Sequence, residues 1–274
     1  MNTAHTPTGD LTRKRLRQRL AWCRPLLGLL VFCRSAWRQF GAGLPLVRAV
    51  GAWCWFRREW RLFRSMPGGR RFNADVFYWD PCLRDRTEST PLDPIYFIQD
   101  TWFAGLIAQR RPAHHVDVGS SAKTMALVAQ FVPVTMVDIR PVPLTVPNFV
   151  FVQGSILALP FADRSVGSLS SICVIEHIGL GRYGDDLDPD GSEKAAAELC
   201  RVLAVGGHLY ISVPIDTECR VYFNAHRAFT RNRVMELCVG LELVAEQYLY
   251  GWDVLPDYDP ARGFGTGMYH FRKL

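Results

Sequence analysis

The stretch SLSSICVIEHIGLGRYGDDLDPDGSEKAAAELCRVLAVGGHLYISVP, residues 168–214, decides the fold. It predicts an apolar strand, a loop that carries Glu176 and His177, a helix, a turn at Gly206-Gly207 and a second apolar strand. Upstream, Asp117-Val118-Gly119 and Val137-Asp138 each end a further predicted strand. Strands, carboxylates and turns in this order are typical of a sheet that binds a nucleoside-containing cofactor at its strand ends.

Apolar runs and helical patterns alternate from residue 113 onward, which predicts an α/β fold with a Rossmann-like, doubly wound, mostly parallel sheet. The predicted strands are His115–Val118, Thr135–Val137, Asn148–Val152, Leu169–Val174, His208–Val213, Glu242–Tyr250 and Gly267–Arg272. The last two strands are expected to form an antiparallel pair at one sheet edge. The predicted helices are Tyr96–Gln109, Thr124–Phe131, Ser192–Leu203 and Thr230–Val239.

Charge divides the chain into unlike parts. Residues 1–71 hold 15 Lys or Arg against 2 acidic residues, a net charge of +13, whereas the remaining residues carry −7. We therefore expect a basic helical extension at 1–71, a lid or cap segment at 72–112 and the Rossmann-like domain at 113–274. An acidic domain argues against a nucleic-acid-binding face.

Tryptophan and arginine interleave through residues 11–64, which hold five of the eight tryptophans. Tryptophan prefers the lipid headgroup region, and arginine is attracted to anionic lipid. The apolar run Leu26–Cys33 is shorter than the roughly 20 residues that span a bilayer. The extension is expected either to lie on an anionic membrane surface as amphipathic helices or to form a helical cap with a solvated basic face.

The eight cysteines include no Cys-x-x-Cys pair and are spread through the predicted strands and helices. This distribution is typical of reduced, buried thiols and argues against structural zinc. We expect a cytoplasmic protein that the basic extension could attach peripherally to the inner face of a membrane.

The predicted strand ends define a cofactor site. The turn after the first strand must let backbone approach the ligand closely, which favours Gly119. Asp138 lies 21 residues after Asp117 at the end of the second strand, where a carboxylate can accept hydrogen bonds from ribose hydroxyls. A dinucleotide site would need Gly-x-Gly-x-x-Gly, and only the first of these glycines is present, which argues against NAD.

Five segments in this order resemble the class I S-adenosylmethionine-dependent methyltransferases. They are Asp117-x-Gly119, Asp138, Leu159-Pro160-Phe161-Ala162-Asp163, Ile175-Glu176-His177 and the run 198–207, ELCRVLAVGG. The resemblance covers about residues 113–273. The combination of DVGSS, DIRP and FNAHR is similar to a largely uncharacterised branch of that superfamily.

The resemblance implies S-adenosylmethionine as the cofactor. Asp117 and Gly119, with Ser120 next to them, would frame its methionine portion, and Asp138 would hold its ribose. Ile139 would lie against the adenine. The remaining implied contacts are an adenine edge at Gly154, Ser155 and Ile156, and a backbone contact at Cys173. Serines at 120 and 121 stand where the family usually has glycine, and Ser155 stands where Asp is common.

Methyl transfer from a sulfonium needs in-line positioning and, for a protonated nucleophile, a base. His177 is the first candidate base, because it follows the fourth strand at the cofactor-facing rim; a structural role is the alternative. His226 is the second, in a loop whose Asn224 and Arg227 are suited to recognise a polar substrate, or else to cap a helix.

The loop 179–189 is the most distinctive feature of the chain. Arg182, Tyr183 and Asp185 are predicted to grip a substrate, and a solvated connector is the alternative. No Asp-x-Asp-x-Asp-Gly loop is present, so no metal site is expected.

These features together predict an S-adenosylmethionine-dependent methyltransferase that acts on a small-molecule or glycan/lipid-linked acceptor. One alternative is a non-catalytic Rossmann-fold binding or scaffold protein with a degenerate cofactor site, which the three serines favour. Another is a nucleotide-sugar-modifying enzyme that uses the same cleft. Cofactor binding discriminates among them.

Overall fold

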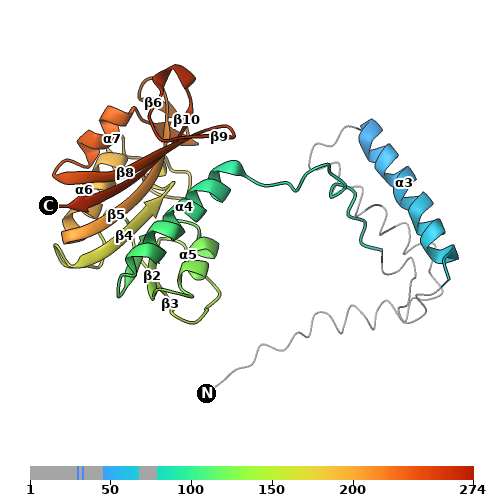
Figure 1. Cartoon of the computed structure of the whole chain (residues 1–274), viewed down its shortest axis with the longest axis horizontal. Coiled ribbons are helices and arrows are strands. Elements are labelled where there is room, and N and C mark those ends of the chain that lie inside the picture. Colours follow the sequence, from blue (N-terminus) through green and yellow to red (C-terminus); the bar gives the residue numbers. More distant parts are fainter. Residues whose placement is uncertain (1–29, 31–32, 34–45, 68–78) are drawn as a thin grey trace. The chain divides into compact units, whose positions relative to one another are not determined.

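The computed structural model describes residue Leu30, residue Cys33, residues 46–67 and residues 79–274 (Figure 1). Predictions for the other residues, which include most of the Trp/Arg-rich stretch, lie outside the described part. The chain divides into two compact units, Met1–Pro91 and Leu92–Leu274. The predicted lid segment therefore has residues in both units, and the helix at its end belongs to the second.

The second unit is built on an eight-stranded sheet with the order β3-β2-β1-β4-β5-β10-β8-β9. The first five strands of that order run parallel, and β10 is antiparallel to both β5 and β8. The strands are β1 His115–Val118, β2 Val134–Asp138, β3 Phe149–Gln153, β4 Val166–Ile172, β5 Leu203–Ile215, β8 Leu241–Tyr250, β9 Asp253–Leu255 and β10 Gly265–Lys273. This is the predicted Rossmann-like, mostly parallel sheet, and strand order reverses between β1 and β4.

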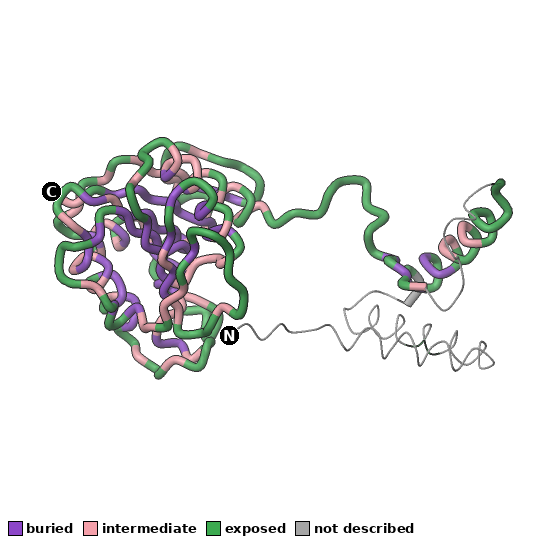
Figure 2. Tube along the Cα trace, turned by 90° about the horizontal axis from the view of Figure 1, so that it is seen from below, coloured by how far each residue is buried: buried purple, intermediate pink, exposed green. Residues whose placement is uncertain are grey.

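Helices cover both faces of the sheet (Figure 1). Helices α4 (Pro94–Arg110) and α5 (Ala122–Val128) bury Phe103, Ile107 and Met125 against one face. Helices α6 (Gly191–Val202) and α7 (Arg231–Leu237) bury side chains such as Leu199 and Val234 against the other. Figure 2 shows the buried residues of this unit concentrated inside it. Two apolar layers on one sheet explain why its strands read as nearly continuous apolar runs.

Side-chain caps fix where three helices begin. The Asp93 carboxylate accepts the backbone N–H groups of Ile95 and Tyr96 at the start of α4. Ser121 and Thr230 accept backbone N–H groups in the same way before α5 and α7. Each cap satisfies donors that the first helical turn leaves unpaired.

Two local features differ from the sequence prediction. Strand β5 begins at Leu203, directly after α6. The predicted turn at Gly206-Gly207 is therefore part of β5, in the stretch where its pairing with β4 is irregular. A Cβ at Gly207 would lie 2.8 Å from the Ala204 carbonyl oxygen, which explains the glycine. Strands β6 (Arg220–Tyr222) and β7 (His226–Ala228) form a short hairpin where a loop was expected.

The described part of the first unit contains helix α3, Leu46–Ser65. Its buried face includes Ala52 and Trp53, which pack with Leu83. The Trp79 ring meets the rings of Phe56 and Trp60 edge to face, with centroids 5.3 and 5.5 Å apart. Among the residues that the structure describes, no helix combines the length and apolar character that a membrane crossing requires.

Candidate functional site

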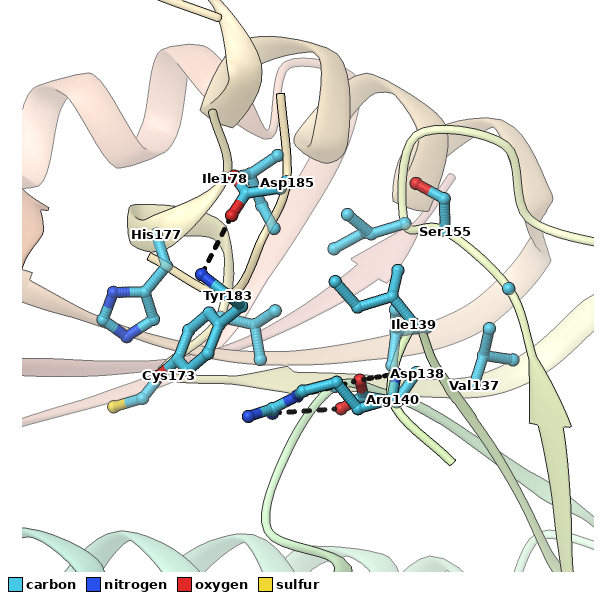
Figure 3. A pocket seen from close by; sticks show the side chains of 15 residues that line it. Val137, Asp138, Ile139, Arg140, Ser155, Cys173, His177, Ile178, Tyr183 and Asp185 are labelled. Carbon is cyan, nitrogen blue, oxygen red and sulfur yellow. Dashed lines mark hydrogen bonds and ion pairs between the residues drawn. The ribbon is translucent and has the colours of Figure 1, made fainter. Parts of the chain in front are cut away.

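A cleft opens beyond the carboxyl ends of β1, β2 and β4, at the reversal of strand order (Figure 3). It holds about 640 Å³ of empty space, including space open to solvent. Its lining residues are Val118, Gly119, Val137, Asp138, Ile139, Arg140, Gly154, Ser155, Ile156, Cys173, Val174, His177, Ile178, Tyr183 and Asp185. Its position and lining are those of a small-molecule or cofactor site.

Gly119 shapes the floor of the cleft. It has a φ of +73°, and a Cβ at this position would lie 2.9 Å from Val174 Cγ1. Its N–H donates to the Val137 carbonyl at 2.9 Å, which ties the turn to β2. Only glycine fits this turn without strain, so backbone itself forms part of the cleft wall.

Asp117 and Ser120 hold that turn from behind. The Asp117 carboxylate is fully buried and accepts the backbone N–H and hydroxyl of Ser120 and the hydroxyl of Ser170. Ser120 Oγ also accepts the Ile172 N–H at 2.9 Å. Burial raises the pKa of Asp117 to about 6. Neither residue lines the cleft, so their placement differs from the predicted contact with a cofactor.

Asp138 ends β2 with its carboxylate on the cleft wall. Its Oδ1 accepts the Arg140 backbone N–H at 2.8 Å. Ile139, Gly154, Ser155 and Ile156 line the same wall, and their contact with an adenine stays a prediction. Ser155 Oγ accepts the Leu157 N–H at 3.2 Å and so closes its own turn.

Cys173 lines the cleft and has a left-handed backbone conformation, with φ of +53°. Its thiol donates to Gln99 Oε1 at 3.2 Å and lies 3.3 Å from Ser212 Oγ. Burial raises the pKa of this thiol far above its usual range, so the thiol stays neutral. The side chain anchors the strand end under α4.

His177 lies in the 3-10 turn η3, Ile175–His177, and lines the cleft. Its Nδ1 is 2.7 Å from the Ala225 carbonyl oxygen, and a carbonyl only accepts, so Nδ1 carries the proton. Nε2 therefore has the free lone pair, and it lies 3.6 Å from Glu176 Oε1. Burial lowers the pKa of His177 to about 4. The ring is neutral, and both of its nitrogens face protein groups.

Glu176 is a buried carboxyl group for which the sequence pattern predicted no separate role. It is 1% exposed, and its Oε2 has no hydrogen-bond partner. Burial raises its pKa to about 8, so it is protonated at neutral pH. A neutral carboxyl beside a neutral imidazole adds no net charge to this side of the cleft.

The loop after η3 closes on itself through Asp185. The Asp185 carboxylate accepts the backbone N–H groups of Gly179 at 2.7 Å and Tyr183 at 3.2 Å. These bonds hold Tyr183 and Asp185 at the cleft. Arg182 donates to the Ala225 carbonyl at 2.8 Å, which links the loop to the β6–β7 hairpin.

Arg227 is a buried clamp and does not line the cleft. It is 8% exposed and donates four hydrogen bonds. The acceptors are the carbonyls of Ile178, Asp188 and Pro189 and the hydroxyl of Ser192. The predicted substrate contact is not what this geometry provides, because every acceptor belongs to the protein.

His226 and Asn224 also lie outside the cleft lining. The His226 ring packs beside the rings of Tyr222 and Phe264, with centroids 5.1 and 5.6 Å away. Asn224 is exposed in the hairpin turn. Thus only Arg182 and His177, among the predicted polar residues of this region, meet at the hairpin through Ala225.

Arg140 is a cleft residue that the sequence reasoning missed. Its guanidinium lies over the Tyr183 ring, 4.3 Å from the centroid, and 3.5 Å from the Asp138 carboxylate (Figure 3). The available signal was a basic residue two positions after a strand-ending aspartate. Periodicity gave no reason to expect it to reach the loop after β4.

Comparisons with known proteins find a family model that matches part of the chain and solved structures of similar fold. Residues 162–249 match the sequence profile described as "Caenorhabditis protein of unknown function, DUF268". Among curated proteins, no sequence is significantly similar to the chain.

Several solved methyltransferase structures are similar in fold. The N-methyltransferase NodS from Bradyrhizobium japonicum, solved with S-adenosyl-L-homocysteine, is 16% identical over 71% of this chain and 92% of its own, with a TM-score of 0.49. A putative sarcosine dimethylglycine methyltransferase from Galdieria sulphuraria is 17% identical over 65% and 86%, with a TM-score of 0.49. A 1,6-didemethyltoxoflavin-N1-methyltransferase from Burkholderia thailandensis is 19% identical over 68% and 93%, with a TM-score of 0.47.

Proposed function

We propose that this chain binds S-adenosylmethionine in the cleft and transfers its methyl group to an acceptor that enters beside Tyr183. The observation that carries the proposal is the pairing of the Gly119 turn with the Asp138 carboxylate on one apolar cleft at the strand-order reversal. A ribose needs the carboxylate, an adenine needs the apolar wall, and a charged amino-acid tail needs exposed backbone. The residues present fit all three parts.

Individual roles follow from where the side chains lie. Asp138 would accept from the ribose hydroxyls, and Ile139 and Ile156 would contact the adenine. The backbone at Gly119 and Cys173 would meet the methionine portion. When bound, the cofactor supplies an electrophilic methyl group on a sulfonium. The protein then has to orient the acceptor in line with the methyl group and exclude water. Such positioning lowers the barrier to the displacement.

The geometry of His177 favours a positioning role for its ring. Its Nδ1–H is held by the Ala225 carbonyl, and its Nε2 faces Glu176. A base at this point would have to break one of those contacts. The proposed reaction therefore suits an acceptor that is nucleophilic as it enters, such as a neutral amine or an anion.

The serines that favoured a degenerate site have other work in the fold. Ser120 binds Asp117, Ser121 caps α5, and Ser155 closes its own turn. Ser120 and Ser121, which stand where glycine is usual, thus add hydrogen bonds and do not line the cleft, whereas Ser155 lines the cleft with its hydroxyl bonded to its own turn. This supports the enzyme over the scaffold alternative.

Calorimetric titration of the full chain with S-adenosylhomocysteine tests the proposal. Saturable binding is expected, and Asp138→Ala should weaken it by roughly 10- to 150-fold, because charge-assisted hydrogen bonds contribute about 1.5–3 kcal/mol each. Asp257→Ala, a change at an exposed carboxylate outside the cleft, should leave affinity unchanged. A folded wild type that does not bind S-adenosylhomocysteine would favour the scaffold protein. Binding of a nucleotide sugar in its place would favour the nucleotide-sugar-modifying enzyme.

The acceptor is proposed to be a small molecule or a glycan/lipid-linked molecule. Helix α3 of the unit Met1–Pro91 supports the glycan/lipid-linked acceptor. Arg57, Arg61 and Arg64 share one exposed face of α3 by helical spacing, and Arg58 is exposed beside it. Such a face suits an anionic membrane surface, where each arginine contributes about 1 kcal/mol.

A further inference from the structure

We infer that the acceptor carries an oxyanion, a phosphate or a carboxylate, which binds between the guanidinium groups of Arg140 and Arg182 at the mouth of the cleft. This inference rests on the proposed function and names its substrate class. It starts from an arrangement of three side chains around a single aromatic ring.

The guanidinium groups of both arginines lie near the Tyr183 ring. The guanidinium carbon of Arg140 lies 4.3 Å from the ring centroid, and that of Arg182 lies 5.2 Å from it. Arg140 follows β2 and Arg182 follows η3, so two segments of the chain supply one basic site. Figure 3 shows Arg140 extended from Asp138 toward Tyr183. Stacking on an aromatic face holds a guanidinium in place and leaves its edge free for hydrogen bonds.

The donors of these arginines are poorly used by the protein. Both contacts of the Arg140 guanidinium with Asp138 are 3.5 Å long, at the limit of a hydrogen bond. Arg182 donates to the Ala225 carbonyl and makes no ion pair within the part of the chain that the structure describes. Two cations near one ring with so few acceptors need an anion from outside, because guanidinium groups bind carboxylate and phosphate as paired donors.

The carboxyl groups around this site do not meet that need. The Asp185 carboxylate oxygens accept hydrogen bonds from the backbone N–H groups of Gly179, Gly181 and Tyr183. Glu176 is held neutral by burial, and its side chain is fully enclosed. His177 is also neutral. Asp138 is the one carboxylate that touches either guanidinium among the described residues.

Cofactor binding should release Arg140 for the acceptor. Ribose hydroxyls on Asp138 would compete with the two weak guanidinium contacts and leave its strong bond to the Arg140 backbone N–H intact. The sulfonium charge would add to the attraction for an anion in a cleft with apolar walls. An anionic acceptor would thus bind more tightly after the cofactor than before it.

The test is an NMR titration of the full chain, saturated with S-adenosylhomocysteine, with methyl phosphate in one arm and acetate in the other. Saturable binding of either anion is expected for the wild type. Arg140→Gln and Arg182→Gln should each weaken it about tenfold or more, because each removes charged hydrogen bonds. Arg272→Gln, at an exposed position where β10 pairs with the opposite end of β5, is the matched control and should change nothing. The arm with the tighter binding identifies phosphate or carboxylate.

Arg182→Lys separates loss of the paired donors from loss of charge and should fall between wild type and Arg182→Gln. Binding of S-adenosylhomocysteine without any saturable binding of methyl phosphate or acetate would overturn the inference and leave the proposed function standing. Equal loss in Arg272→Gln would also overturn it. If S-adenosylhomocysteine does not bind, the proposed function fails, and the same titration of the free protein decides the inference by its dependence on Arg140 and Arg182.

Discussion

At the scale of single residues, Glu176 couples the stability of the protein to pH. Its pKa rises from an ordinary 4.5 to about 8 because the side chain is fully buried. Between these values the folded chain keeps a proton that the unfolded chain loses. Stability from this group is therefore complete below pH 4.5 and is lost as pH rises through 8, at up to about 1.4 kcal/mol per pH unit.

Other groups leave a window in which Glu176 dominates. Asp117, whose pKa is raised to about 6, changes the stability only below about pH 6. His115 and His177 have lowered pKa values, so they change the stability only below pH 6.5, and there they make it rise with pH. We expect the free energy of unfolding, measured in urea from pH 6.5 to 8, to fall by about 2 kcal/mol.

Glu176→Gln should flatten this slope, since an amide does not titrate. Glu242→Gln changes an exposed carboxylate and should retain the full slope. An unchanged slope in Glu176→Gln would assign the pH dependence to another group.

Sequence reasoning reached the cleft residues that depend on local pattern. Gly119 and Asp138 stand at strand ends, and strand ends follow from apolar periodicity. It could not place Asp117, whose carboxylate is turned away and bonded to Ser170, 53 residues later. It also could not pair Arg140 with Tyr183, since that contact depends on how the loop after β4 folds.

At the scale of elements, the β6–β7 hairpin holds the loop after η3 in place. Arg227 extends from β7 to that loop. Its guanidinium donates to the backbone carbonyls of Ile178, Asp188 and Pro189 and to Ser192 Oγ. The sequence suggested recognition of a substrate because Asn, His and Arg gather there. The structure turns the arginine inward, where its guanidinium donates to backbone carbonyls of the loop and to Ser192 Oγ.

Arg227→Met should destabilise the protein by about 3–5 kcal/mol, because it removes four charge-assisted hydrogen bonds, one of them to the buried Ser192 hydroxyl. Hydrogen exchange should rise in residues 179–190 more than in the strands. Urea unfolding and exchange mass spectrometry measure the two effects. Arg262→Met removes an exposed ion pair and should cost under about 1 kcal/mol. Uniform exchange across the domain would show that Arg227 does not hold this loop specifically.

At the scale of the whole molecule, the two compact units differ in charge and in how far the sequence predicts them. The fold of the second could be predicted because its strands and helices carry distinct periodicities. For the first unit the sequence allowed two predictions, a membrane-surface helix or a packed helical cap, since tryptophan suits both equally. The described residues place Trp53, Phe56, Trp60 and Trp79 in a chain of ring contacts, while Arg57 and Arg61 of α3 are exposed.

We therefore expect the full chain to bind vesicles that contain phosphatidylserine and not vesicles of phosphatidylcholine alone. The double change Arg57→Gln/Arg61→Gln should weaken that binding by roughly 30-fold, because each arginine near the surface contributes about 1 kcal/mol. Arg164→Gln/Arg272→Gln removes the same charge from the second unit and should have little effect. Co-sedimentation at low and high salt measures the change, and attraction by charge requires that added salt reduce it. Equal loss in both double variants would mean that net charge, and not the face of α3, governs binding to the membrane.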